Sequence, residues 1–123
     1  MNVLVIEDHP TDRKLMSVVL KMEGHVVHES ASAESAIDAI LTTTPDVILL
    51  DLRLPGMDGM ALVRQLKANP ETSGIPIVVV TAFPESYPRE DLLAAGCDAY
   101  IAKPINTRQL PNQLREVTER RSG

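Results

Sequence analysis

The feature that most restricts the fold is a short, fully apolar run that stops at an acidic residue. Residues 47–50 form this run within the stretch PDVILLDLRLPGMDG, and it ends abruptly at Asp51. Such a run is typical of a strand covered on both faces in a parallel sheet. A turn at Pro55-Gly56 and a helix cap at Asp58-Gly59 are predicted next. From this stretch alone, Asp51 is either an ordinary strand-ending residue or part of a binding site at a strand's carboxyl end.

Similar runs alternate along the chain with segments of helical spacing. Strands are predicted at residues 3–6, 26–27, 47–50, 77–80 and 99–101, and helices at residues 10–23, 32–41, 89–95 and 107–120 and directly after Gly59. This alternation predicts an α/β fold, a doubly wound parallel sheet of five strands flanked by five helices. Leu15 is grouped with the inward face of the first helix, whereas Arg64 and Lys67 are expected to point outward. Pro111 predicts a distorted or late start to the last helix.

Length and composition limit the class of protein. The 123 residues suit a single domain covering residues 1–123, and no output domain is expected after the last helix. The formal net charge of −5 argues against nucleic-acid binding through a general basic surface. A lone Cys97 and the lack of an apolar run near the roughly 20 residues of a membrane span predict a cytoplasmic protein without a membrane segment.

Polar residues follow four of the predicted strands. Right-handed crossovers place the carboxyl ends of all parallel strands at one edge of the sheet. We therefore expect Glu7-Asp8, Asp51, Thr81 and Lys103 to meet there. Each alone is compatible with a structural role, as a solvated charge or, for Thr81, as a residue with high β propensity. Their joint arrival at one edge favours a functional site.

Three carboxylates in one pocket need a cation or a raised carboxyl pKa, because like charges at short range repel strongly. Lys103 supplies one positive charge, which is too little for three acids. Clustered oxygen ligands with open positions suit Mg²⁺. The sequence has no glycine-rich phosphate loop, so a phosphate here would be small or covalent. Asp51 is then the natural carboxylate to accept a phosphoryl group.

The segments VLVIEDH, PDVILLDLRLPGMDG, IPIVVVTA and GCDAYIAKPI resemble the receiver domain of bacterial two-component response regulators, the chemotaxis-regulator fold. The resemblance covers nearly the whole chain. It implies a stand-alone receiver in which Asp51 accepts a phosphoryl group from a sensor histidine kinase or a histidine phosphotransfer protein. It further implies Mg²⁺ held by Asp8, Asp51 and the backbone carbonyl of Arg53, with Glu7 acting through water. Such a protein is not an enzyme beyond its own phosphorylation and dephosphorylation.

The resemblance also implies a switch. Thr81 and Lys103 would contact the phosphoryl group, and Tyr100 would follow Thr81 inward. The signal would reach an unidentified downstream protein through a face formed by the helix at residues 89–95, the strand of Tyr100 and the last helix. For Tyr100 the alternative is ordinary half-buried packing. The family usually has a cis peptide bond at the step that corresponds to Lys103-Pro104.

Three local features carry further expectations. The first helix, on which Arg13 and Lys14 are expected to be exposed near the pocket, is expected to be the dock for the phosphodonor. His9 is interpreted as a solvated residue at a helix start, since imidazole suits softer metals than Mg²⁺. The two prolines within residues 83–88 predict a stiff loop that limits the conformational change.

Two alternative functions remain open. A haloacid-dehalogenase-like phosphatase also forms an aspartyl phosphate at a strand end, but it needs a second Asp two residues later, where this chain has Arg53. A degenerate receiver would act only as a protein-interaction module, although here every pocket position is occupied by a suitable residue.

Overall fold

The computed structural model describes residues 1–54, 56–82 and 86–122. Pro55 of the predicted turn and residues 83–85 of the predicted stiff loop therefore lie outside the described residues. The elements in chain order are β1 Asn2–Ile6, α1 Pro10–Met22, β2 Val26–Ser30, α2 Ala33–Thr43, β3 Val47–Asp51, β4 Arg53–Leu54, β5 Met57–Asp58, α3 Gly59–Ala68, β6 Ile77–Thr81, α4 Arg89–Ala95, β7 Ala99–Ala102 and α5 Leu110–Ser122.

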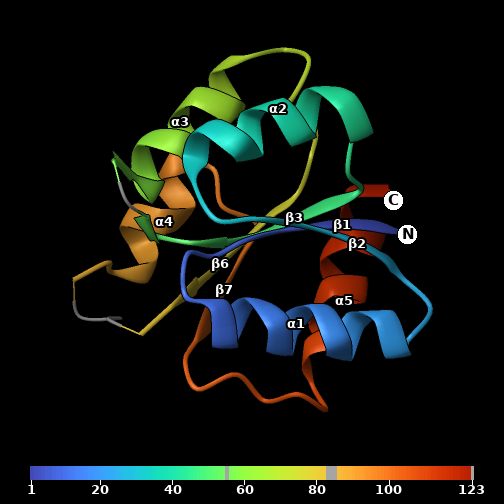
Figure 1. Ribbon diagram of the computed structural model, residues 1–123. Helices are drawn as coiled ribbons and strands as arrows, with labels where there is room; N and C mark the ends of the chain where they lie inside the picture. The colour runs from blue at the N-terminus through green and yellow to red at the C-terminus, as the bar shows by residue number, and fades with distance from the viewer. Residues whose placement is uncertain (55, 83–85, 123) are drawn as a thin grey trace.

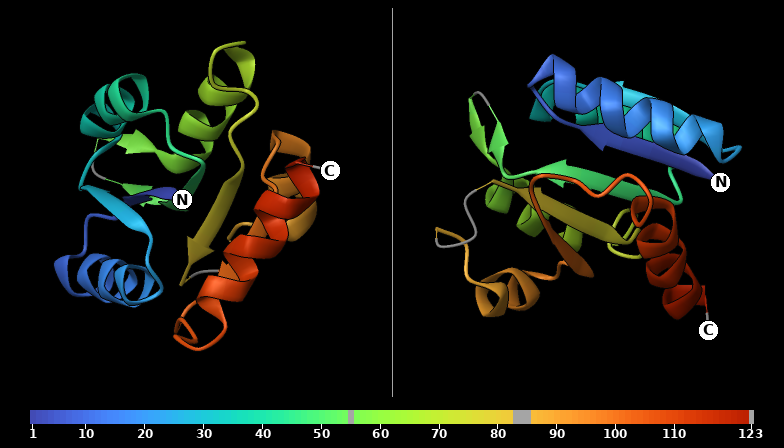
Figure 2. Two further views of the ribbon diagram at one scale, coloured as in Figure 1. Left: turned by 90° about the vertical axis from the view of Figure 1, so that its right-hand side faces the viewer. Right: turned by 90° about the horizontal axis from the view of Figure 1, so that it is seen from below.

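Over the described residues, five parallel strands form one sheet in the order β2-β1-β3-β6-β7 (Figure 1). Helices α1 and α5 cover one face, and α2, α3 and α4 cover the other. The five strands alternate with five helices as predicted, so the doubly wound fold is confirmed. The N-terminus and the end of α5 lie at the opposite end of the sheet from the edge where the strands finish (Figure 2).

Alternate residues of the central strands enter two apolar cores. In β1, Leu4 and Ile6 pack beneath α2 and α3, whereas Val3 and Val5 pack beneath α1 and α5. Strands β3 and β6 are buried at every position. A strand covered on both faces has no solvent side to accept polar residues, which explains the uninterrupted apolar runs of the sequence.

Local signals in the sequence fix the helix ends. The side chains of Ser32 and Asp58 accept hydrogen bonds from the backbone N–H groups of Ser35 and Met60, as N-caps do. Gly96 follows α4 with a φ of 108°, a left-handed conformation that favours glycine. Regular helix in α5 begins at Leu110 after a turn, so the late start predicted from Pro111 is confirmed.

Two expectations about helix faces are wrong. Leu15 is 40% exposed, because α1 buries the stripe through Met16 and Leu20 instead. Lys67 does not point outward: its side chain is 16% exposed and its Nζ lies 3.4 Å from Asp98 Oδ2. The helical spacing placed Lys67 on the outward side with Arg64, and it could not reveal an acid from a distant loop.

The antiparallel strands β4 and β5 follow β3 and were not predicted. Two-residue strands leave no periodic signal in the sequence, and this pair falls where a turn was expected. Over the described part of the chain, no helix combines the length and the apolarity that crossing a membrane requires.

Candidate functional site

Asp51 is the last residue of β3 and is 7% exposed. Its Oδ1 accepts a hydrogen bond from the backbone N–H of Arg53 at 2.9 Å, which fixes the carboxylate relative to the following hairpin. Its Oδ2 lies 3.1 Å from Lys103 Nζ. The central strand β3 therefore holds a buried carboxylate at the edge of the sheet. One of its oxygens accepts a hydrogen bond from a backbone N–H, and the other contacts the lysine ammonium.

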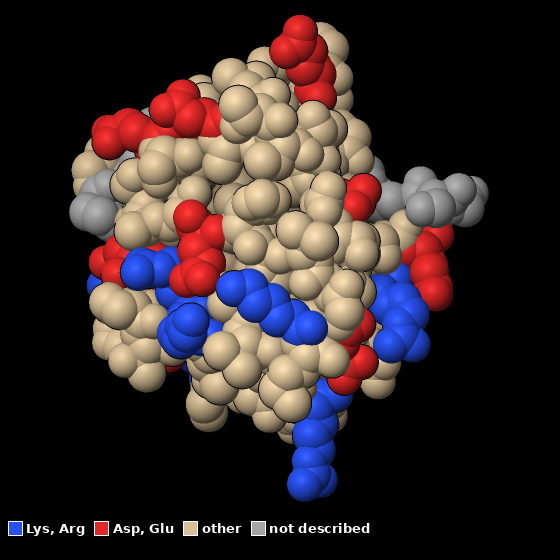
Figure 3. Space-filling model, turned by 45° about the vertical axis from the view of Figure 1, so that its right-hand side comes forward, with Lys and Arg blue, Asp and Glu red and all other residues tan. Residues whose placement is uncertain are grey.

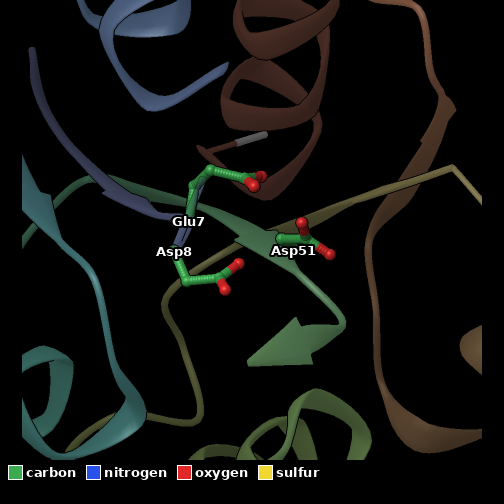
Figure 4. A group of neighbouring side chains, drawn as sticks. All are labelled: Glu7, Asp8 and Asp51. Carbon is green, nitrogen blue, oxygen red and sulfur yellow. The ribbon is translucent and has the colours of Figure 1, made fainter. Parts of the chain in front are cut away.

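Glu7 and Asp8 follow the neighbouring strand β1, and their carboxylates lie beside that of Asp51 (Figure 4). One ligand oxygen from each of the three residues lies within 4.8 Å of the others. Glu7 is fully buried, whereas Asp8 is exposed, so the cluster is open to solvent on the Asp8 side. All three donors are carboxylate oxygens, the ligand type that Mg²⁺ prefers, so the group fits such an ion.

Lys103 reaches the cluster from the loop after β7. Its Nζ lies 3.1 Å from Glu7 Oε2, 3.0 Å from Asp12 Oδ2 and 3.1 Å from Asp51 Oδ2. The peptide bond between Lys103 and Pro104 is cis, as expected. One ammonium thus contacts three acids that lie on three different segments of the chain.

These contacts and the burial of the pocket shift the pKa values of Glu7 and Lys103. Burial raises the pKa of Glu7 to about 7, and the adjacent Asp51 carboxylate raises it too, while Lys103 acts in the opposite direction. For Lys103, burial favours the neutral amine, but hydrogen bonds to Asp12 and Glu7 and the charge on Asp51 outweigh it, so its pKa is raised. The lysine in this pocket therefore stays charged, whereas Glu7 gains or loses its proton near neutral pH.

The remaining predicted site residues lie on adjoining segments. Thr81 ends β6 and is 1% exposed, and its backbone carbonyl accepts a hydrogen bond from the N–H of Lys103 at 2.8 Å. Arg53 is exposed at the start of the hairpin. Tyr100 is half-buried on β7, where it packs against the core beneath α3 and α4. An open hollow of about 420 Å³ adjoins the carboxylates and is lined by Asp8, Leu52, Arg53, Leu54, Asp58 and Tyr87.

Asp12 was not predicted as a site residue, and the role expected of Arg13 is wrong. Asp12 contacts Lys103 at 3.0 Å, and its place in the first turn of α1, shortly after Glu7 and Asp8, was the available signal. Arg13 is not a free docking residue, because its Nη1 donates to the Glu7 carbonyl at 3.0 Å and its Nε pairs with Glu29 Oε1 at 3.3 Å. Lys14 and His9 are exposed, as expected.

On the face shown in Figure 3, basic and acidic side chains are interspersed among the described residues. This face presents no continuous basic surface of the kind that general nucleic-acid binding requires.

A five-stranded parallel sheet in the order β2-β1-β3-β6-β7 places the chain in the flavodoxin-like class of doubly wound domains, in which ligands bind beyond the carboxyl ends of the strands. The family model described as the response regulator receiver domain matches residues 3–115. The chain belongs to this family. Its members are signalling domains of two-component systems that interact with histidine kinases or phosphotransfer proteins.

Individual relatives agree with the family. The phosphate regulon transcriptional regulatory protein PhoB of Pseudomonas aeruginosa is 36% identical over 118 residues, which cover 96% of this chain and 52% of PhoB. This chain thus spans about half the length of that relative. The polar-differentiation response regulator DivK of Brucella ovis is 33% identical over 105 residues, 85% of each chain.

A solved structure supports the fold. The receiver domain of the sensor histidine kinase PA1611 from Pseudomonas aeruginosa PAO1, crystallised with a magnesium ion coordinated in its active site cleft, has a TM-score of 0.87 and 30% sequence identity. The similarity covers 96% of this chain and 97% of that one.

Proposed function

We propose that this chain is a phosphoacceptor domain in which Asp51 receives a phosphoryl group from a phosphohistidine on a sensor histidine kinase or a histidine phosphotransfer protein. The observation that carries the proposal is the contact of three carboxylates with one lysine at the carboxyl edge of the sheet. In the transfer, an Asp51 oxygen forms a bond to phosphorus while the bond from phosphorus to the donor's imidazole nitrogen breaks. The imidazole leaves with the electron pair of that bond.

The chain's own residues prepare this step. The backbone N–H of Arg53 orients Asp51 through Oδ1. Lys103 supplies a positive charge beside Oδ2, where negative charge accumulates during transfer. The open hollow lined by Asp8, Leu52 and Arg53 lies next to this site in the chain and would admit the donor.

Glu7, Asp8 and Asp51 are the residues that would hold Mg²⁺, with the backbone carbonyl of Arg53 as a further oxygen ligand and Glu7 acting through water. When bound, the ion neutralises charge on the transferring phosphoryl group. Support comes from the all-oxygen donor set and from the magnesium ion in the related PA1611 receiver domain.

The output of the proposed switch is a change of the face formed by α4, β7 and α5. A phosphoryl group adds about −1.5 to −2 charges and three acceptor oxygens. The Thr81 hydroxyl and Lys103 would bind some of these oxygens, and Tyr100 would move further inward from its half-buried position. The altered face would then bind a downstream protein. The expectations of a stand-alone domain and of a cytoplasmic location stay predictions.

The test is incubation with acetyl phosphate and Mg²⁺ followed by intact-mass analysis. Wild-type protein is expected to gain one phosphoryl group, and neither Asp51→Asn nor wild type in chelator should gain it. Asp38→Asn, which removes an exposed acid on α2, serves as the matched control and should react like wild type. Phosphorylation that persists in Asp51→Asn would refute the assignment of the acceptor, and turnover of phosphate esters would favour a phosphatase.

A further inference from the structure

Asp12 is the third carboxylate that contacts Lys103. It is neither part of the acidic group Glu7, Asp8 and Asp51 nor the proposed phosphoacceptor, so its contact with the lysine needs another explanation. It lies in the first turn of α1. Its Oδ2 is 3.0 Å from Lys103 Nζ, no farther than the oxygens of Glu7 and Asp51. Its side chain is 34% exposed, whereas those of Glu7 and Asp51 are 1% and 9% exposed. The lysine is therefore shared between two buried acids and one that water can reach.

A lysine ammonium has three N–H donors, and here three carboxylate oxygens accept them. Lys103 has no remaining donor for an incoming phosphoryl oxygen unless it releases one of these partners. Release of a buried carboxylate leaves a charged acceptor without solvent, which is costly. Release of Asp12 is cheaper, because water can replace the ammonium there.

We propose that Asp12 is a positioning residue that holds Lys103 in the unphosphorylated protein and is exchanged for a phosphoryl oxygen when Asp51 is modified. This inference rests on the phosphoacceptor function proposed above. It makes Asp12 a regulator of how readily the site is phosphorylated, acting through Lys103 rather than by touching the reacting atoms.

The negative charge on Asp12 should favour Mg²⁺ binding and slow phosphorylation. With Asp12 present, the charge of Lys103 is shared among three carboxylates and the pocket is one unit more negative, so a divalent cation binds better. The same negative charge repels an anionic phosphodonor and occupies a donor of the lysine. Removing the charge should therefore weaken Mg²⁺ binding and, at saturating Mg²⁺, speed phosphorylation.

The experiment compares wild type with Asp12→Asn, Asp12→Glu and the control Glu34→Gln, which removes an acid from the first turn of α2. Mg²⁺ affinity is measured by calorimetry, and the initial rate of phosphorylation by acetyl phosphate is measured at saturating Mg²⁺. For Asp12→Asn we expect Mg²⁺ binding about three- to tenfold weaker and phosphorylation about three- to tenfold faster, the scale of one nearby partly screened charge. Asp12→Glu should return both values toward wild type, and Glu34→Gln should change neither.

A third readout needs no phosphorylation. In chelator, NMR should show the Lys103 ammonium protons exchanging with water faster in Asp12→Asn than in wild type. A merely structural role would lower Mg²⁺ affinity and phosphorylation rate together, so slower phosphorylation in a folded Asp12→Asn overturns the inference, as does unchanged ammonium exchange. A wild-type protein that takes no phosphoryl group would instead overturn the proposed function, and the inference with it.

Discussion

Asp51 Oδ2 and Lys103 Nζ lie 3.1 Å apart, although 52 residues separate them in the sequence. The lysine is shared among three acids, so the acceptor carboxylate is only partly neutralised in the absence of a metal ion. Two consequences follow, one for stability without metal and one for its dependence on pH.

Without Mg²⁺, Asp51→Asn should stabilise the protein. The change removes one negative charge from a crowded anionic pocket, and it removes the neighbour that helps to raise the pKa of Glu7. We expect a gain of about 1 kcal/mol, or a melting temperature about 4 °C higher, in chelator. Added Mg²⁺ should then stabilise wild type more than the mutant, by mass action. A mutant that melts below wild type in chelator would refute this account of the pocket, with Asp38→Asn as the control for loss of an exposed acid.

Glu7 should make the metal-free protein less stable as the pH rises from about 4.5 to about 7. Its pKa is raised from 4.5 to about 7 in the folded protein, so in this window the folded state keeps a proton that the unfolded state has lost. Stability falls with rising pH wherever the folded state binds more protons, here by about 3 kcal/mol across the window. Urea denaturation of wild type and Glu7→Gln in chelator at several pH values measures the effect.

The difference in unfolding free energy between those two proteins should change across the window, with Glu7→Gln the less dependent on pH. The matched variant Glu34→Gln alters an exposed acid and should track wild type. Parallel curves for wild type and Glu7→Gln would show that burial does not hold a proton on Glu7.

Lys67 should contribute to stability as a half-buried hydrogen-bond donor. Its Nζ donates to the carbonyl oxygens of Ser73 at 3.2 Å and Ile75 at 2.9 Å as well as contacting Asp98. Lys67→Met would remove the ammonium from these three oxygens, and we expect a loss of about 2–3 kcal/mol in chemical denaturation. Arg64→Met on the exposed side of the same helix is the control and should change stability by less than about 0.5 kcal/mol. Equal effects of the two changes would mean that Lys67 is only a surface charge.

The sequence predicted the fold because its signals were local or followed from topology. Uninterrupted apolar runs mark strands buried on both faces, and parallel connections bring Glu7, Asp51 and Lys103 to one edge whatever the details of packing. Asp12 was overlooked and Lys67 was misjudged for a shared reason. Both are charged residues beside an apolar stripe, where helical spacing alone does not tell a solvated charge from one paired with a distant segment.

The sequence also gave no sign of how closely α3 approaches the turn after β3. Gly59 begins this helix, and its N–H donates to the Leu52 carbonyl at 2.9 Å. A Cβ on Gly59 would lie 2.5 Å from Leu52 Cα and 2.8 Å from its carbonyl oxygen. Backbone atoms at this distance cannot turn aside as a flexible side chain could, so any larger residue must push the helix from the turn.

Gly59→Ala should therefore destabilise the protein by about 3 kcal/mol, the upper range for overpacking. Leu52 lies between Asp51 and Arg53, so the same displacement should loosen the hydrogen bond from the Arg53 N–H to Asp51 Oδ1 and slow phosphorylation by acetyl phosphate. Gly74→Ala is the control, because a Cβ there would meet nothing within 4 Å. Denaturant midpoints and phosphorylation rates of both variants test the claim, and a Gly59→Ala protein as stable and as reactive as Gly74→Ala would show that α3 can move without disturbing the acceptor.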